Sequence, residues 1–153
     1  MRGVYEANFL ASGVNSLRTL MLLTAPANKV VEILSASITD ASNTTNAQLA
    51  AAFQQVTTLG TPASTSVTPT KGEQGDQASG STVTANVTGS EPTYTNNTQI
   101  GLRGFASLGG WEFSPVPEER VYVGGGATIG LRLLDTAPSA TDFMVRISYR
   151  EIG

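Results

Sequence analysis

The stretch RVYVGGGATIGLRLL, residues 120–134, decides the fold class because the chain turns there without starting a helix. Three glycines after an apolar segment are typical of phosphate-binding loops, which lead into a helix whose N-terminal amides face the anion. After Gly126, however, the apolar residues Ile129, Leu131 and Leu133 stand at every second position. This alternation indicates a strand. We therefore predict a glycine turn or bulge joining two neighbouring strands, and no phosphate site.

Short strand-like segments lie on both sides of this stretch. Residues 98–107, 111–113 and 142–151 are each bounded by Gly, Pro or Asp, and residues 4–24 contain two further β-favouring segments. The segment KVVEILSASIT, residues 29–39, is apolar on both faces and therefore suits the middle of a sandwich. Because the spacing is short and there is no strand–helix–strand rhythm, the sequence predicts an all-β chain folded as an antiparallel, jelly-roll-like β-sandwich.

Residues 48–57, QLAAAFQQVT, fit two patterns at once. Leu49, Ala52 and Phe53 follow the helical period, whereas Leu49, Ala51 and Phe53 alternate as in a strand. The flanking Thr-rich and Gly-containing segments are typical of turns and strands. We predict a strand here.

The length of 153 residues suits one domain, spanning residues 1–153. Residues 1–12 form either a contact arm or the first strand. Residues 58–99 are rich in Thr, Ser, Gly, Asn and Pro and contain one clear alternating strand at 81–88. This loop-rich region consists either of exposed loops between edge strands or of a surface that meets a partner.

The composition excludes several classes of function. The chain has no histidine and no cysteine, which removes the usual zinc sites, disulfides and the Ser-His and Cys-His catalytic systems. The net charge is −3 and the nine Lys and Arg are scattered, so we expect no direct contact with nucleic acid. We expect no metal, no cofactor and no catalytic site.

The longest apolar run near the N-terminus, LMLLTAPA at 20–27, is too short to span a bilayer. Glu6 and Asn8 interrupt the first ten residues, which is unlike a secretion signal. The sequence therefore predicts a soluble protein that is not exported and does not associate with a membrane.

Trp111 and Phe113 lie on the same side of a predicted strand, with Glu112 between them. Packing in the core is the first interpretation of this pair. The alternatives are a sugar-stacking platform or an anchor at a subunit interface.

Three segments in this order, FQQVTTLGTPASTSVTP (53–69), EPTYTNNTQIG (91–101) and GWEFSPVPEERVYVGGGATIGLRLL (110–134), resemble small virion proteins of tailed bacteriophages. These are generally taken to be capsid decoration, or cement, proteins. The resemblance covers about the last two-thirds of the chain, and the family pattern supports a strand at 48–57. The charge-rich loop SPVPEER departs from the Pro-Gly-Gly-type loop of the family.

The resemblance implies a structural protein that binds the outer surface of a phage capsid and stabilises it. The implied partners are the major capsid protein and further copies of this chain, in a homotrimer. The implied location is the capsid surface of the virion, after synthesis in the host cytoplasm. The candidate interface residues lie in the N-terminal strand and in the loop at 113–119 with the aromatic strand before it: Val4, Tyr5, Phe9, Trp111, Phe113, Pro115 and Pro117.

Two other functions remain as alternatives. A glycan- or receptor-binding module on a phage head or tail fibre would need Trp111, Tyr94 and Phe113 to be exposed. A glycan hydrolase would have to rest on carboxylates, for which Glu112, Asp135 and Asp142 are the candidates.

Overall fold

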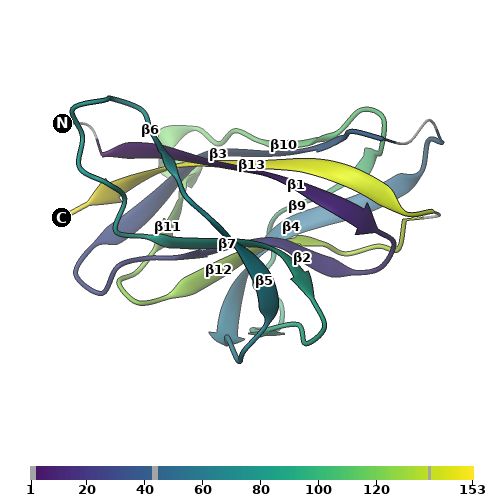
Figure 1. Ribbon diagram of the computed structural model, residues 1–153, viewed down its shortest axis with the longest axis horizontal. Coiled ribbons are helices and arrows are strands. Elements are labelled where there is room, and N and C mark those ends of the chain that lie inside the picture. Colours follow the sequence, from purple (N-terminus) through teal and green to yellow (C-terminus); the bar gives the residue numbers. More distant parts are fainter. Residues whose placement is uncertain (1–2, 43–44, 138) are drawn as a thin grey trace.

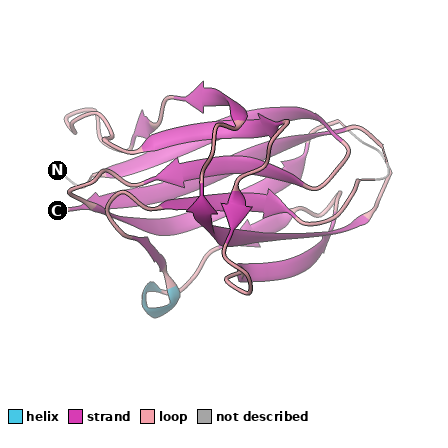
Figure 2. Ribbon diagram, turned by 90° about the horizontal axis from the view of Figure 1, so that it is seen from below, coloured by secondary structure: helices cyan, strands magenta, loops and turns pink. Residues whose placement is uncertain are grey.

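The computed structural model describes residues 3–42, 45–137 and 139–153. The secondary structure of these residues consists of strands joined by loops, with one short 3₁₀ turn at Pro117–Glu119 that stands out in Figure 2. The strands are β1 (Val4–Val14), β2 (Arg18–Thr24), β3 (Val30–Asp40), β4 (Gln48–Thr58), β5 (Ala63–Val67), β6 (Thr70–Lys71), β7 (Thr82–Thr88), β8 (Thr93–Tyr94), β9 (Ile100–Ala106), β10 (Trp111–Phe113), β11 (Val121–Val123), β12 (Thr128–Leu133) and β13 (Thr141–Ile152).

The strands form two antiparallel sheets that pack face to face as the two layers of a sandwich (Figure 1). The first sheet has the order β10-β3-β13-β1-β6, and β11 also pairs with β3. The second sheet has the order β5-β7-β2-β12-β4-β8, and β9 also pairs with β4. The predicted all-β sandwich is therefore confirmed.

The strand order is also that of a jelly roll. From β1 to β4 the chain alternates between the two sheets, and later β12 returns between β2 and β4 while β13 returns between β1 and β3. This gives two halves with four strand positions each: β1-β13-β3 followed by β10 and β11, which lie end to end along β3, and β2-β12-β4-β9. The loop-rich region 58–99 contributes the additional strands from β5 to β8, including the predicted strand at 81–88 as β7.

The core lies between the sheets and follows the alternation read from the sequence. In β4, Leu49, Ala51 and Phe53 point into it, which confirms the predicted strand. Ala52 and Gln54 lie on the other face of β4 and are nevertheless buried. Burial on both faces explains why this strand also fits the helical period.

Residues 89–98, named the strap here, cover that outer face of the second sheet. Tyr94 pairs with β4, and the amide of Gln54 donates a hydrogen bond of 2.9 Å to the carbonyl oxygen of Thr95. The guanidinium of Arg132 lies 4.0 Å from the centre of the Tyr94 ring. Burial raises the pKa of Tyr94 to about 12 although its bond to the Thr19 hydroxyl opposes the shift. The strap is therefore a packed element and not a free loop.

The N-terminal segment is the first strand, which is the second of the two alternatives considered for residues 1–12. From Val4 onward it pairs along β13, and the ring of Tyr5 is only 3% exposed. Met1 and Arg2 lie outside the described residues.

The three glycines do form a turn, but the strands that they join are not neighbours. The preceding strand, β11, pairs with β3 in the first sheet, whereas β12 lies in the second sheet. A Cβ on Gly125 would lie 2.5 Å from the carbonyl oxygen of Ala27, and Gly126 has a positive φ of 76°. Glycine is needed because the chain, as it crosses from the first sheet to the second, packs closely on the backbone of the turn that follows β2.

Candidate functional site

Trp111 and Phe113 form an aromatic cluster with Phe53 at one edge of the sandwich. Their rings are nearly parallel, with centroids 6.2 Å apart, and the Phe53 ring meets them edge-on at 6.0 and 5.5 Å. The Trp111 side chain is 1% exposed and belongs to the core, as the first interpretation predicted. Phe113 is half-buried at the rim of the same cluster.

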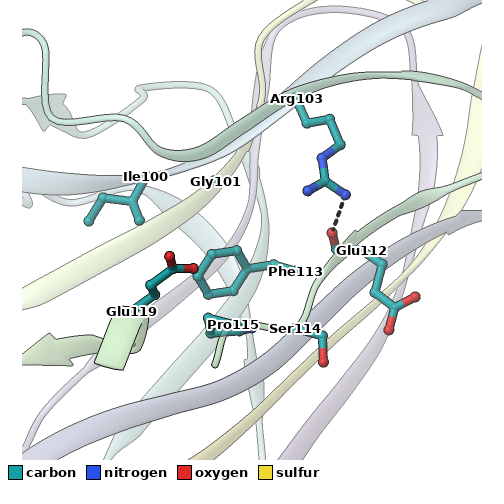
Figure 3. Close-up of a pocket in the computed structure, with 8 residues that line it drawn as sticks. All are labelled: Ile100, Gly101, Arg103, Glu112, Phe113, Ser114, Pro115 and Glu119. Atoms are coloured by element: carbon teal, nitrogen blue, oxygen red, sulfur yellow. Dashed lines mark hydrogen bonds between the residues drawn. The ribbon is translucent and has the colours of Figure 1, made fainter. Parts of the chain in front are cut away.

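A surface hollow of about 570 Å³ opens beside Phe113 (Figure 3). It lies where β9, at the edge of the second sheet, meets β10, at the edge of the first sheet. The loop that follows β10 and the 3₁₀ turn close one side of it. Its lining residues are Ile100, Gly101, Arg103, Glu112, Phe113, Ser114, Pro115 and Glu119.

The two edge strands beside the hollow cap one another. The indole Nε1 of Trp111 donates a hydrogen bond of 3.2 Å to the carbonyl oxygen of Gly101 on β9. In the other direction, Nη1 of Arg103 donates to the carbonyl oxygen of Glu112 on β10 at 3.5 Å. Edge strands otherwise expose unpaired backbone groups that recruit other chains. At this edge, side-chain donors already occupy two of those groups.

The hollow combines an apolar floor with charges of both signs. Phe113, Ile100 and Pro115 supply the apolar surface, and Arg103 faces the hollow with most of its five N–H donors unengaged within the described residues. Glu119 lies beside the Phe113 ring, whereas the Glu112 side chain points away from it (Figure 3). This arrangement can bind a protein segment or a sugar. Within the described residues, no group of three or more acidic side chains is placed to hold a metal ion.

A buried ion-pair cluster fixes the loop that borders the hollow. Arg120 directly follows the 3₁₀ turn, and its guanidinium lies 3.1 Å from the carboxylate of Glu32 on β3. Arg150 and the hydroxyl of Tyr122 also donate to Glu32, at 2.8 and 3.2 Å. Burial raises the pKa of Glu32, but these donors outweigh it and hold the pKa below its ordinary value. The charged Glu32 therefore anchors the rim of the hollow.

The structure divides the predicted interface residues between two surfaces. Phe113 and Pro115 line the hollow, Pro117 begins the adjacent 3₁₀ turn, and Trp111 lies beneath. The other three residues, Val4, Tyr5 and Phe9, lie on β1. In the first sheet, β13 and β3 lie between β1 and β10. Tyr5 is buried and Phe9 packs against the core, so of these three Val4 lies on the outer face of the sheet.

Two residues that line the hollow, Arg103 and Glu119, were not among the candidates predicted from the sequence. Arg103 stands two residues before the buried Phe105, and this parity directs its side chain toward the gap between the sheets. That signal was present in the sequence. The position of Glu119 depends on the 3₁₀ turn, for which the sequence carried no clear pattern.

The three carboxylates considered for hydrolysis do not meet at the hollow. Glu112 borders it, but neither Asp135 nor Asp142 lines it. Asp142 accepts a hydrogen bond of 2.8 Å from the backbone amide of Gly13 at the end of β1. The hollow therefore lacks the carboxylate set on which that alternative rests.

The three sequence segments that carry the resemblance meet at this site. Phe53 of the first segment packs on Phe113 of the third, with ring centroids 5.5 Å apart. Gly101 of the second segment accepts the hydrogen bond from Trp111 of the third. Residues of these three segments thus form one packed unit beneath the hollow.

Comparisons with protein-family models, with curated proteins and with solved structures find no match to this chain. No helix within the described residues is long and apolar enough to span a membrane.

Proposed function

We propose that this protein is a structural component of a tailed-phage virion that binds the outer surface of the capsid and stabilises it. The observation that carries the proposal is that residues of the three resembling segments pack together directly beneath one surface hollow, which the second and third segments also line. The jelly-roll order adds support because this architecture recurs in viral capsid proteins. The task requires no catalysis, only a rigid fold with a complementary surface.

The hollow and the loop at 114–119 are the proposed contact with the major capsid protein. Phe113 and Pro115 offer apolar surface for burial, which provides affinity. Arg103 and Glu119 offer opposite charges at the rim, which orient a partner segment and reject mismatched ones. The proposed location is the capsid surface, and the homotrimer implied by the resemblance stays a prediction.

Co-sedimentation tests this proposal. The purified protein is mixed with expanded capsids of the phage that carries its gene, assembled without the protein, and the bound fraction is measured after centrifugation. We expect wild-type protein to sediment with the capsids. Reversing a rim charge, as Arg103→Glu or Glu119→Lys, should weaken binding at least about tenfold, equal to about 1.4 kcal/mol.

Asp135→Lys is the matched control because Asp135 is exposed and lies outside the hollow. It should bind like the wild type. Wild-type protein that stays in the supernatant at every concentration would overturn the capsid role. Binding that Asp135→Lys weakens as much as Arg103→Glu does would remove the hollow from the contact.

Glycan binding remains the second candidate function, carried by the half-exposed Phe113 ring beside the carboxylate of Glu119. The wider aromatic platform that it requires is reduced, since Trp111 is buried and Arg132 covers the Tyr94 ring. A glycan array tests it. A sugar bound by wild-type protein and lost in Phe113→Ala, with the fold retained, would favour this candidate over the capsid role.

A further inference from the structure

The strand β1 is paired on both sides only near its start. Along one side it pairs with β13 from Val4 to Ala11, and again at Val14 after a bulge. On the other side, β6 reaches only Tyr5 and Glu6. Among the described residues, no strand pairs with the outer side of β1 beyond Glu6 (Figure 1).

Backbone parity shows which groups face this open side. The amide of Gly72 donates a hydrogen bond of 2.7 Å to the carbonyl oxygen of Val4, so the backbone groups of Val4 point away from β13, toward the side of β1 on which β6 lies. The carbonyl oxygen of Gly3 accepts a hydrogen bond from the amide of Glu151 on β13, so this carbonyl points toward β13. In an antiparallel strand this direction alternates from residue to residue. The N–H and C=O groups of Asn8 and Leu10 therefore point to the open edge.

The side chains along this edge do not guard it. Natural edge strands are protected by charged side chains, prolines or covering segments. Residues 7–14, ANFLASGV, contain neither a charge nor a proline. By contrast, side-chain donors cap the β9 and β10 edges at Gly101 and Glu112, and the short β6 carries Lys71.

Exposed apolar side chains lie directly beside the open edge. Leu10 is 49% exposed, and Met144, the residue opposite it on β13, is 57% exposed. Both point away from the core, on the outer face of the first sheet, and they border a shallow hollow of about 290 Å³. Glu6 is the nearest charge on β1, and Arg146 compensates it at 2.9 Å.

We propose that the open edge of β1 pairs with β1 of a second copy of this chain, antiparallel and about a twofold axis at Leu10. The two Leu10 residues then lie opposite each other and exchange backbone hydrogen bonds, which their parity permits. The outer face gains a continuous apolar row, in which the two Leu10 side chains are flanked by Met144 of each copy. Self-pairing also brings no like charges together, because residues 7–14 are uncharged.

This inference does not depend on the capsid role and differs from the trimer that the resemblance implies. A twofold contact joins the same patch on both copies and closes after two. A protein that dimerises through β1 but binds no capsid would leave the inference standing and overturn the proposed function.

The test begins with the native mass, measured by sedimentation equilibrium over a range of protein concentrations. Wild-type protein should reach twice the chain mass as the concentration rises. Leu10→Lys places two like charges opposite each other across the axis and should weaken dimerisation at least about tenfold. Leu102→Lys is the matched control, because Leu102 is 56% exposed but lies on β9. It should dimerise like the wild type.

A second variant and a second measurement address the backbone. Asn8→Pro removes an N–H that faces the open edge and breaks no bond to β13, so it should fold and fail to dimerise. Amide hydrogen exchange should show Leu10 exchanging rapidly in dilute protein and becoming protected as the dimer forms.

Three outcomes overturn the proposal. The first is wild-type protein that stays monomeric or forms a trimer. The second is a dimer that Leu10→Lys weakens no more than Leu102→Lys does. The third is a dimer in which the Leu10 amide stays unprotected. If Leu10→Lys does not fold, Asn8→Pro decides in its place.

Discussion

Replacing Glu151 by glutamine should make the stability of the protein much less dependent on acid pH. The Glu151 carboxylate lies near the end of β13 and its side chain is 2% exposed. It accepts hydrogen bonds from the Ser79 hydroxyl at 2.6 Å, from the amide and hydroxyl of Ser81 at 2.9 and 2.8 Å, and from Lys29 at 2.9 Å. These bonds tie the loop before β7 to the first sheet. Glu151→Gln keeps the shape and removes the charge.

The magnitude follows from the pKa. Burial raises the pKa of Glu151, but the bonds from Ser79, Lys29 and Ser81 outweigh it and lower the pKa from 4.5 to about 2. A difference of about 2.5 between unfolded and folded pKa values, at about 1.36 kcal/mol for each, amounts to about 3 kcal/mol. Because the folded pKa is the lower one, this stability is fully present above pH 4.5 and is lost as the pH falls toward 2.

Urea unfolding of wild type and Glu151→Gln from about pH 7 down to about pH 2 measures this contribution. The wild type should be more stable by about 3 kcal/mol at neutral pH, and the difference should shrink toward zero at the acid end. Glu118→Gln, at an exposed carboxylate, is the control and should track the wild type throughout. A Glu151→Gln difference that stays constant with pH would refute the reasoning.

Three further substitutions test the packing by urea unfolding. Gly125→Ala places a Cβ 2.5 Å from a backbone oxygen and should lower the free energy of unfolding by more than about 1 kcal/mol. In Gly124→Ala the new Cβ meets nothing within 4 Å, so the free energy of unfolding should change little. Equal losses in the two variants would contradict the turn geometry. Gly130→Ala places a Cβ 2.5 Å from the Tyr94 hydroxyl, so it should lower the free energy of unfolding by about 1–3 kcal/mol. It should also speed proteolysis within the strap, and an unchanged cleavage rate would count against that packing. Trp111→Phe removes the indole bond to β9 and should cost about 1–3 kcal/mol, whereas wild-type stability would mean that the cap contributes nothing.

Part of the candidate site was accessible from the sequence. The alternation of Trp111 and Phe113 predicted a shared inward face, and the structure places both in the aromatic cluster. The position of Arg103 follows the same parity, because its side chain shares a strand face with the buried Phe105. Glu119 and the hollow itself were not accessible, because they depend on β9 meeting β10 and on the turn between β10 and β11.

The local sequence pattern of the glycine stretch predicts its strand and its turn but not which strands the turn joins. Alternation after Gly126 correctly predicted a strand and a turn instead of a phosphate loop. It did not reveal that the turn crosses from the first sheet to the second. The reason is that glycine permits both a hairpin and a crossover, and the choice depends on which strands are already paired.

The sequence by itself determined the all-β class, because short β-favouring segments, several with apolar residues at every second position, recur along the chain without a strand–helix–strand rhythm. It also determined the absence of histidine and cysteine chemistry. Only the tertiary structure decided which strands are neighbours, and with that the jelly-roll order, the hollow beside Phe113 and the open edge of β1. Alternation specifies which side of a strand faces the core. It does not specify the strand beside it, since that pairing joins residues far apart along the chain.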